Sequence, residues 1–326
     1  MPDDRSAAPA HGAPGAASTA AEAEGVTVVV ITRDRCASLL RTLDRLAELP
    51  ERPEVIVVDN ASGDDTAERV RDHPVGARLL TPRRNTGALG RNLAVQQAGT
   101  RYVAFSDDDS WWRPGALRTA AALLDAHPRL GLLAARTLVG PVETEDPLNA
   151  VLAASPLPPA EDLPGRPVLG FLGCAAVVRR RAFLAVGGYH PLLFFGAEET
   201  LLAYDLAAGG WGVSYEPSLV AHHHPAAEER PGRSPRVRRN ALLTDWLRRP
   251  LRVALGGTGR LALAAARRDP GAATALCSAL VRLPAALRQR RTLPPHVEDA
   301  VRTVERRQPE PRAADGRRPG RRKARA

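Results

Sequence analysis

Short apolar runs alternate with amphipathic segments in the first 130 residues. The runs from Val26 to Ile31 and from Val55 to Asp59 are rich in β-branched residues, which is typical of strands covered on both faces. Between them, leucines at positions 39, 40, 43 and 46 have helical spacing and predict a helix over residues 37–49. Strands that alternate with helices predict parallel β-α-β units, whose strands end along one edge of a sheet.

The alternation continues and predicts further elements. Helices are expected over residues 66–72, 88–98 and 114–126, a short strand over residues 77–80, and another strand from Tyr102 to a run of three carboxylates. Residues 141–167 are rich in proline and acidic residues, and we expect a loop there. We therefore expect a leader (1–25), an α/β domain (26–235), a helical extension (236–308) and a basic disordered tail (309–326).

Charge is distributed unevenly along the chain. The 326 residues carry a net charge of +10, and much of the excess lies beyond Arg233. A basic segment binds anionic lipid or nucleic acid, but a nucleic-acid surface interleaves aromatic residues with the basic ones. Aromatic residues make up only 4% of the chain and are scarce in its last third, so we expect no nucleic-acid partner.

Targeting signals are not recognisable in the sequence. Residues 1–25 lack the apolar core of a signal peptide, and arginines interrupt the Ala/Leu-rich stretch 251–287. The cysteines Cys36, Cys174 and Cys277 are far apart and are expected to be reduced thiols. We expect a cytoplasmic protein, and the Arg/Leu/Ala-rich C-terminal region permits a peripheral contact with the inner face of a membrane.

The carboxylates Asp107, Asp108 and Asp109 directly follow a predicted buried strand. Strand ends in open α/β sheets are where ligands bind, and adjacent carboxylates repel one another unless a cation neutralises them. Mg²⁺ and Mn²⁺ prefer oxygen ligands and often bridge to substrate phosphates. The triplet therefore indicates a site for a metal and a diphosphate. The alternative is a solvated acidic turn that caps the next helix.

Polar residues also follow the other predicted strands. Thr32 and Arg35 follow the first strand and Asp59 follows the second. Asn85 and Arg91 lie where a helix begins, and a helix N-terminus with an arginine favours a diphosphate. These side chains are expected along the same sheet edge as the triplet. For Asp59 the alternative is an ordinary turn, and for Arg35 a surface charge.

Six segments occur in an order that resembles a known family. They are VTVVVITRDR at 26–35, VIVVDNAS at 55–62, RNTGALGRNLA at 84–94, DDD at 107–109, GFLGCAAVVRR at 170–180 and GAEETLLAYDL at 196–206. Over roughly residues 26–224 the chain resembles a family 2 glycosyltransferase with the GT-A fold, a mostly parallel sheet flanked by helices. The resemblance implies transfer of a sugar, with inversion, from a nucleotide-diphosphate sugar. The acceptor hydroxyl would belong to a glycan, a lipid-linked sugar or a small molecule in glycan or cell-envelope biosynthesis.

The resemblance also implies roles for individual residues. A divalent metal, Mn²⁺ or Mg²⁺, would bind Asp109, with His222 or His224 as a further ligand. The donor nucleotide would contact a set of seven residues: Thr32, Arg35, Asp59, Asn85, Arg91, Asp107 (at the ribose) and Asp108. The general base would come from the pair Glu198 and Glu199, with Glu199 in its position. The family usually has an aspartate there, so the choice within the pair stays open, and the histidines could equally form a solvated loop.

Two other functions are compatible with parts of the sequence. A sugar-phosphate nucleotidyltransferase also uses an α/β nucleotide-binding sheet, but it would be expected to carry a glycine-rich loop after the first strand. The segment TRDRCAS at 32–38 contains no glycine, which disfavours that function. The charge of +10 alone would fit a non-catalytic protein that binds nucleic acid or a membrane surface.

Overall fold

The computed structural model describes residues 23–225 and 233–307. The predicted tail and nearly all of the predicted leader lie outside these residues. The strands are β1 (Ala23–Thr32), β2 (Val55–Asp59), β3 (Arg78–Leu80), β4 (Thr100–Asp107), β5 (Ser110–Trp112), β6 (Leu130–Val139), β7 (Thr144–Glu145), β8 (Arg166–Pro167), β9 (Ala176–Arg179) and β10 (Gly212–His223). The helices are α1 (Cys36–Ala47), α2 (Thr66–Arg71), α3 (Leu89–Gln97), α4 (Ala116–Ala126), α5 (Pro147–Ala153), α6 (Arg180–Ala185), α7 (Glu198–Ala208), α8 (Arg233–Arg248), α9 (Leu251–Ala266), α10 (Ala272–Arg288) and α11 (Pro295–Arg307).

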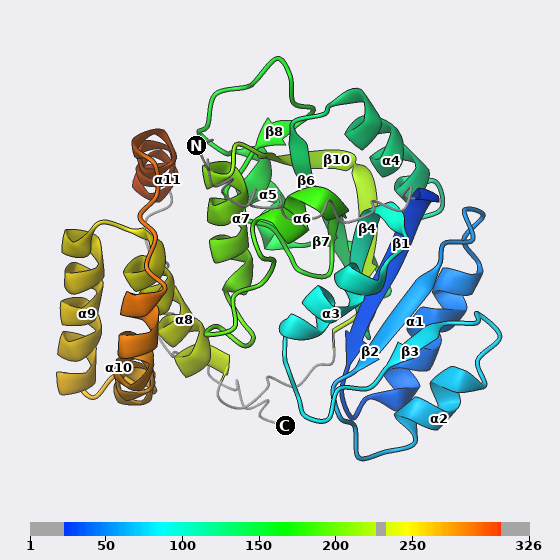
Figure 1. The fold of residues 1–326 in the computed structure, drawn as a ribbon, viewed down its shortest axis with the longest axis horizontal. Coiled ribbons are helices and arrows are strands. Elements are labelled where there is room, and N and C mark those ends of the chain that lie inside the picture. Colours follow the sequence, from blue (N-terminus) through cyan, green and yellow to red (C-terminus); the bar gives the residue numbers. More distant parts are fainter. Residues whose placement is uncertain (1–22, 226–232, 308–326) are drawn as a thin grey trace, which may run out of the picture.

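One mixed sheet forms the centre of the α/β part (Figure 1). Its strand order is β3-β2-β1-β4-β9-β6-β10-β5, with β7 paired to β6 and β8 to β10. Strands β3, β2, β1 and β4 are parallel, as the alternating pattern predicts. Strand β9 runs antiparallel between β4 and β6, so the second half of the sheet is not uniformly parallel. The ends of β1, β2 and β4 lie together at one edge.

Both faces of the sheet are covered, which explains the continuous apolar runs in its strands. Val28 and Val30 of β1 pack into a cluster with α1 and α4, while Val29 and Ile31 pack into a second cluster with α3, α6 and α7. Thr32 and Asp59 are opposite each other in the β1–β2 register, where both strands end. The buried strands therefore hold the polar residues that follow them in fixed positions.

The expectation of a loop over residues 141–167 was wrong in part. This segment contains the short strands β7 and β8 and the helix α5. Asp146 caps α5, because its Oδ1 accepts a hydrogen bond of 2.8 Å from the backbone N–H of Leu148, and Pro147 occupies the first turn. An aspartate followed by proline is a helix-start signal that the high proline content obscured.

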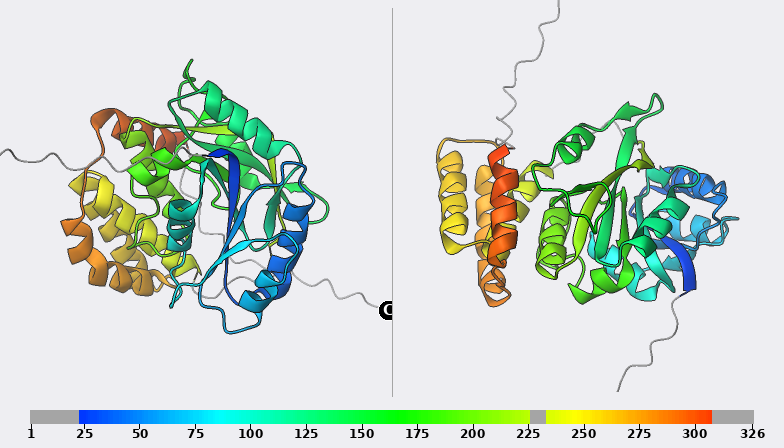
Figure 2. Two further views of the ribbon diagram at one scale, coloured as in Figure 1. Left: turned by 45° about the vertical axis from the view of Figure 1, so that its right-hand side comes forward. Right: turned by 90° about the horizontal axis from the view of Figure 1, so that it is seen from above.

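The helices after residue 232 form a separate layer at one side of the sheet (Figure 2). A third apolar cluster joins Leu201 of α7 to Leu243 and Leu247 of α8 and to Ala279 of α10. Ion pairs add to this packing, because Arg248 Nη2 lies 2.9 Å from Asp205 Oδ2. Within the described residues, no helix combines the length and apolar composition that a membrane span needs.

Candidate active site

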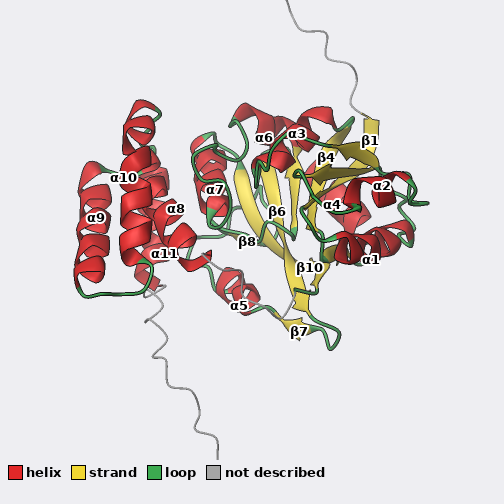
Figure 3. Ribbon diagram, turned by 90° about the horizontal axis from the view of Figure 1, so that it is seen from below, coloured by secondary structure: helices red, strands yellow, loops and turns green. Residues whose placement is uncertain are grey.

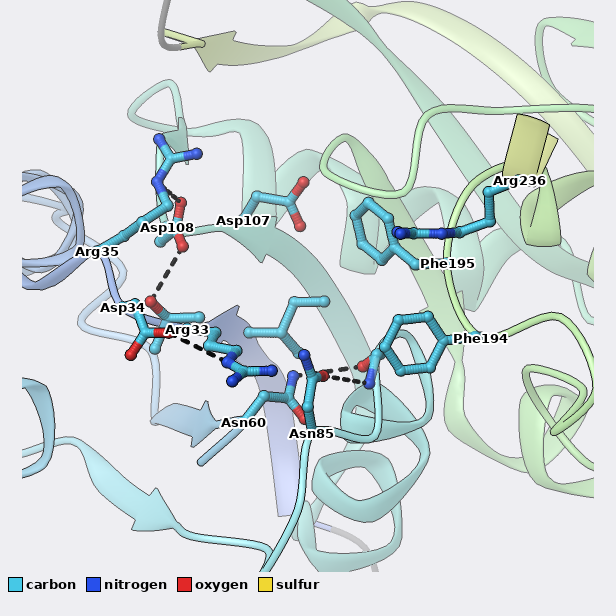
Figure 4. Close-up of a pocket in the computed structure, with 13 residues that line it drawn as sticks. Arg33, Asp34, Arg35, Asn60, Asn85, Asp107, Asp108, Phe194, Phe195 and Arg236 are labelled. Atoms are coloured by element: carbon cyan, nitrogen blue, oxygen red, sulfur yellow. Dashed lines mark hydrogen bonds and ion pairs between the residues drawn. The ribbon is translucent and has the colours of Figure 1, made fainter. Parts of the chain in front are cut away.

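A cavity of about 270 Å³ opens at the carboxyl ends of β1, β2 and β4 (Figure 4). Its walls come from six parts of the chain: the end of β1 with the segment after it, the residue after β2, the loop before α3, the end of β4, the segment before α7, and the start of α8. The lining residues are Ile31, Thr32, Arg33, Asp34, Arg35, Asn60, Asn85, Gly87, Asp107, Asp108, Phe194, Phe195 and Arg236.

The carboxylate triplet meets cationic partners at this cavity. Arg35 bridges two members, with Nε 3.1 Å from Asp108 Oδ1 and Nη2 2.8 Å from Asp109 Oδ2. Thr32 Oγ1 donates a hydrogen bond of 3.0 Å to Asp108 Oδ2. Burial raises the pKa of Asp108 to about 7, although the nearby Arg35 opposes this shift. The predicted convergence of Thr32, Arg35 and the triplet is therefore present.

Arg91 lies beneath the cavity and does not line it. Its side chain is 1% exposed and forms an ion pair with Asp107, whose side chain is 26% exposed and borders the cavity. Burial alone would lower the pKa of Arg91, but Asp107 and the acid pair of α7 raise it. In this conformation Arg91 positions Asp107, so a direct contact of Arg91 with the donor stays a prediction.

The acid pair begins helix α7, after a strained turn with positive φ at Phe194 and Ala197. Glu198 is 2% exposed. Burial, and then repulsion from Glu199, raises the pKa of Glu198 above its ordinary value. Glu199 lies close to Arg91 and to Gly173, where an added Cβ would come within 2.9 Å of Glu199 Oε1. The two acids therefore occupy different surroundings.

The three histidines at the end of β10 alternate between two sides. His222 stacks on Trp111 with ring centroids 5.8 Å apart, and His224 lies 4.6 Å from the same ring. His223 points the other way, and its Nε2 is 3.4 Å from Asp109 Oδ1. His222 and His224, the histidines expected at the metal, lie together at Trp111, and the imidazole at the Asp109 carboxylate belongs to His223. Strand alternation carried this signal, which sequence reasoning missed.

Asp59 and Asn60, which end and directly follow β2, have different roles. Asp59 does not line the cavity, and its Oδ1 accepts a hydrogen bond of 2.9 Å from the N–H of Ser62, as in the alternative of a turn. Asn60 lines the cavity and ties it together, because its Oδ1 accepts a hydrogen bond of 3.1 Å from the N–H of Thr86. Asn85 also lines the cavity, as expected.

Gly87 permits the close approach of two cavity walls. Its φ is +59°, and an added Cβ would lie 2.3 Å from the carbonyl oxygen of Phe194. That oxygen accepts a hydrogen bond of 2.7 Å from the N–H of Ala88. A side chain at position 87 would therefore separate the start of α3 from the segment before α7.

Substitution of this glycine gives a stability prediction. Gly87→Ala should lower the free energy of unfolding more than Gly76→Ala, by about 1–3 kcal/mol, because only position 87 adds a clash to the left-handed backbone. Gly76 is a matched control, with φ at +66° and no heavy atom within 4 Å of an added Cβ. Urea unfolding of both variants measures the difference, and equal losses would contradict the role of Gly87.

Arg236 at the start of α8 also lines the cavity, where it lies beside Phe194 and Phe195 (Figure 4). Its guanidinium carbon is 5.7 Å from the centroid of the Phe194 ring. None of these three residues is among the site residues expected from the sequence. Only the packing of α8 on α7 reveals that this arginine reaches the triplet's cavity.

The donor set at the triplet suits a hard divalent cation. Carboxylate oxygens with one imidazole are ligands that Mn²⁺ and Mg²⁺ accept. Among the described residues, no three His, Cys, Asp or Glu side chains converge into a formed metal site. A metal ion at Asp109 would therefore compete with Arg35, which already neutralises this carboxylate at 2.8 Å.

Comparison with known proteins connects this geometry to a family. Residues 27–187 match the model of glycosyl transferase family 2. The N-acetylglucosaminyl-diphospho-decaprenol L-rhamnosyltransferase of Mycobacterium tuberculosis is 30% identical over 282 residues, which are 71% of this chain and 89% of that protein. The poly(ribitol-phosphate) β-N-acetylglucosaminyltransferase TarS of Staphylococcus aureus is 35% identical over 78 residues, 23% of this chain and 14% of TarS.

Solved structures show the same fold at low sequence identity. The mannosyltransferase PcManGT from Pyrobaculum calidifontis, in complex with GDP-Man and Mn²⁺, has a TM-score of 0.54 and 23% identity over 86% of this chain and 85% of that one. TarS residues 1–349 with UDP-GlcNAc have a TM-score of 0.53 and 18% identity over 68% of this chain and 66% of that one. The sheet and flanking helices thus form a GT-A fold. The chain belongs to glycosyltransferase family 2 and is a glycosyltransferase.

Proposed function

We propose that the enzyme transfers a sugar from a nucleotide-diphosphate sugar to an acceptor hydroxyl, with inversion at the anomeric carbon. The observation that carries this proposal is the cavity at the ends of β1, β2 and β4. It places the carboxylates of Asp107 and Asp108 opposite the guanidinium of Arg236, around a space of about 270 Å³. Solved structures of this fold contain GDP-Man or UDP-GlcNAc, which supports a nucleotide sugar as the donor.

Glu199 acts as the general base in the proposed reaction. It removes the proton from the acceptor hydroxyl while the hydroxyl oxygen attacks the anomeric carbon, and the nucleoside diphosphate leaves from the opposite side. Glu198 is less suited, because its raised pKa favours the protonated form near neutral pH. Arg91 pairs with Asp107 and lies near the acid pair, whose negative charges raise its pKa. A divalent metal, if held by Asp109 with His223 beside it, would supply positive charge to the leaving diphosphate.

Arg236 is proposed to contact the diphosphate from α8. Arg236→Ala should weaken the binding of a nucleoside diphosphate about tenfold, because it removes a charge-assisted hydrogen-bond donor. Arg238 provides a matched control two residues away, since it forms an ion pair with Asp269 and does not line the cavity. Calorimetric titration with UDP and GDP measures both variants. Equal affinities in Arg236→Ala and Arg238→Ala would contradict this contact.

The acceptor is proposed to be a sugar linked to a lipid diphosphate. The mycobacterial relative is named for such an acceptor, N-acetylglucosaminyl-diphospho-decaprenol. An acceptor anchored in a bilayer requires the enzyme to reach a membrane surface. A cytoplasmic location with a peripheral contact at the inner face of the membrane satisfies this requirement.

A panel of nucleotide sugars with Mn²⁺ tests the proposed function. At least one donor should raise the melting temperature and should release its nucleoside diphosphate when acceptor is added. Metal removal by EDTA should suppress the release, and Mn²⁺ or Mg²⁺ should restore it. A panel in which no nucleotide sugar either stabilises the protein or turns over would overturn the proposal.

A further inference from the structure

Exposed apolar side chains concentrate on two neighbouring helices. Nine large apolar side chains are exposed among the described residues, and six of them belong to α9 and α10. They are Leu251, Leu255, Leu263, Leu280, Val281 and Leu287, with exposures up to 79%. A monomeric protein normally scatters such residues, so their concentration indicates a surface that meets a partner.

The apolar residues of α9 form one stripe with a basic border. Leu251, Leu255 and Leu263 are exposed at spacings of four and eight residues, and exposed Gly259 and Ala262 continue the stripe between them. Arg252 and Arg267, near the two ends of this stripe, are exposed as well. Leucines beside arginines are the composition of a helix that lies in a membrane interface.

Helix α10 lies beside α9 and repeats the pattern (Figure 3). Its exposed positions Cys277, Leu280, Val281, Pro284 and Leu287 follow helical spacing, and Arg288 ends the stripe. Residues 251–291 contain eight arginines and one acidic residue, Asp269, which is paired with Arg238. The charge of this layer therefore complements an anionic surface.

The turn between α9 and α10 lies next to the candidate active site. An added Cβ at Gly271, at the start of α10, would come within 2.6 Å of Pro235 Cγ at the start of α8. The next residue, Arg236, lines the donor cavity. A partner bound along α9 and α10 would therefore extend toward the mouth of this cavity.

We propose that the protein docks on an anionic lipid membrane through α9 and α10. The contact is made by the α9–α10 surface, which comprises the six exposed apolar residues and the arginines Arg252, Arg267 and Arg288. The leucines insert at the level of the acyl chains, and the arginines contact lipid phosphates. This inference rests on the proposed lipid-linked acceptor for its biological purpose. The contact itself requires no sugar transfer and is tested without it.

Flotation of the full chain with vesicles tests the surface. The wild type should float with vesicles of phosphatidylcholine and phosphatidylglycerol, and should bind phosphatidylcholine alone much more weakly. The double variant Leu255→Glu/Leu263→Glu should lose about tenfold or more in partitioning. In the double variant Arg252→Gln/Arg267→Gln, partitioning onto the anionic vesicles should fall about fivefold for each charge removed, and partitioning onto phosphatidylcholine should not change.

Val142→Glu is the matched control, because Val142 is 83% exposed and lies far along the chain from α9 and α10. It should float like the wild type. Unchanged flotation of the leucine variant would overturn the proposal and assign binding to other basic segments. The proposal would also be overturned if the wild type does not float but forms a dimer, and the leucine variant is monomeric. That result would show that the α9–α10 surface binds a second copy of the chain. If the enzyme transfers sugar but does not float, the proposed lipid contact is wrong and the proposed function stands. If it floats but transfers no sugar, the proposed function is wrong and the lipid contact stands.

Discussion

Asp109→Ala is expected to abolish metal-dependent sugar transfer while the fold stays intact. The carboxylate is the proposed metal ligand, and a metal that neutralises a leaving diphosphate contributes several kcal/mol to the transition state. We expect turnover to fall by about 10³-fold or more. Asp109 is buried at the end of the triplet, where it neutralises charge with Arg35 and His223. Its loss removes one carboxylate partner of Arg35, which still pairs with Asp108, and the carboxylate beside His223, but it removes no apolar packing.

Two quantities are measured: the turnover number, and the affinity for Mn²⁺, which electron paramagnetic resonance of the ion reports. Asp162→Ala serves as the control, because Asp162 is exposed and paired with Arg129 far from the cavity. Circular dichroism should show the same fold in both variants. A purified Asp109→Ala enzyme with wild-type turnover and Mn²⁺ affinity would remove Asp109 from the metal site.

Glu199→Gln is expected to lower the turnover number by about 10²–10⁴-fold with little change in donor affinity, because general-base catalysis contributes about that factor. Glutamine keeps the size of the side chain but accepts no proton. Turnover is measured with saturating donor, and donor affinity is measured separately by calorimetry. A large loss of donor affinity with unchanged turnover would assign Glu199 to binding.

Glu198→Gln is the matched comparison in the same helix turn. The folded-state pKa of Glu198 is raised above the ordinary value of 4.5, so the unfolded chain loses this proton at lower pH than the folded chain. The contribution of Glu198 to wild-type stability therefore falls as the pH rises from about 4.5 to about 8, whereas the glutamine does not titrate. The free energy of unfolding of Glu198→Gln relative to the wild type should therefore increase between about pH 4.5 and about pH 8. If Glu198→Gln abolishes turnover and Glu199→Gln does not, the base is Glu198.

Much of the first half of the fold followed from local pattern. The strands β1, β2 and β4 could be predicted because both faces are buried, which leaves uninterrupted β-branched runs such as Val26 to Ile31. The antiparallel insertion of β9 could not, because pairing partners depend on contacts far apart in sequence. The segment 141–167, which contains α5, was misinterpreted because its prolines are typical of a loop, although Pro147 begins the helix.

In the candidate site too, local patterns predict some residues and long-range packing determines the others. Thr32, Arg35 and the triplet were predictable, since each directly follows a strand that ends at the same edge. His223 was overlooked, although strand alternation alone separates it from His222 and His224. The contribution of Arg236 depends on the packing of α8 against α7, and no local pattern encodes it. Residues supplied by a neighbouring layer are the ones that a single sequence hides.

Phosphorus NMR of the wild-type reaction tests the central claim most directly. The enzyme is incubated with Mn²⁺, an N-acetylglucosaminyl-diphospho-lipid acceptor and the nucleotide sugar that stabilises it most. The account predicts that nucleoside diphosphate appears in step with the loss of the nucleotide sugar, while the acceptor gains one sugar. A parallel reaction contains pyrophosphate as well. If it yields sugar phosphate and a nucleoside triphosphate, and neither reaction yields a nucleoside diphosphate, the enzyme is a nucleotidyltransferase and the account is contradicted.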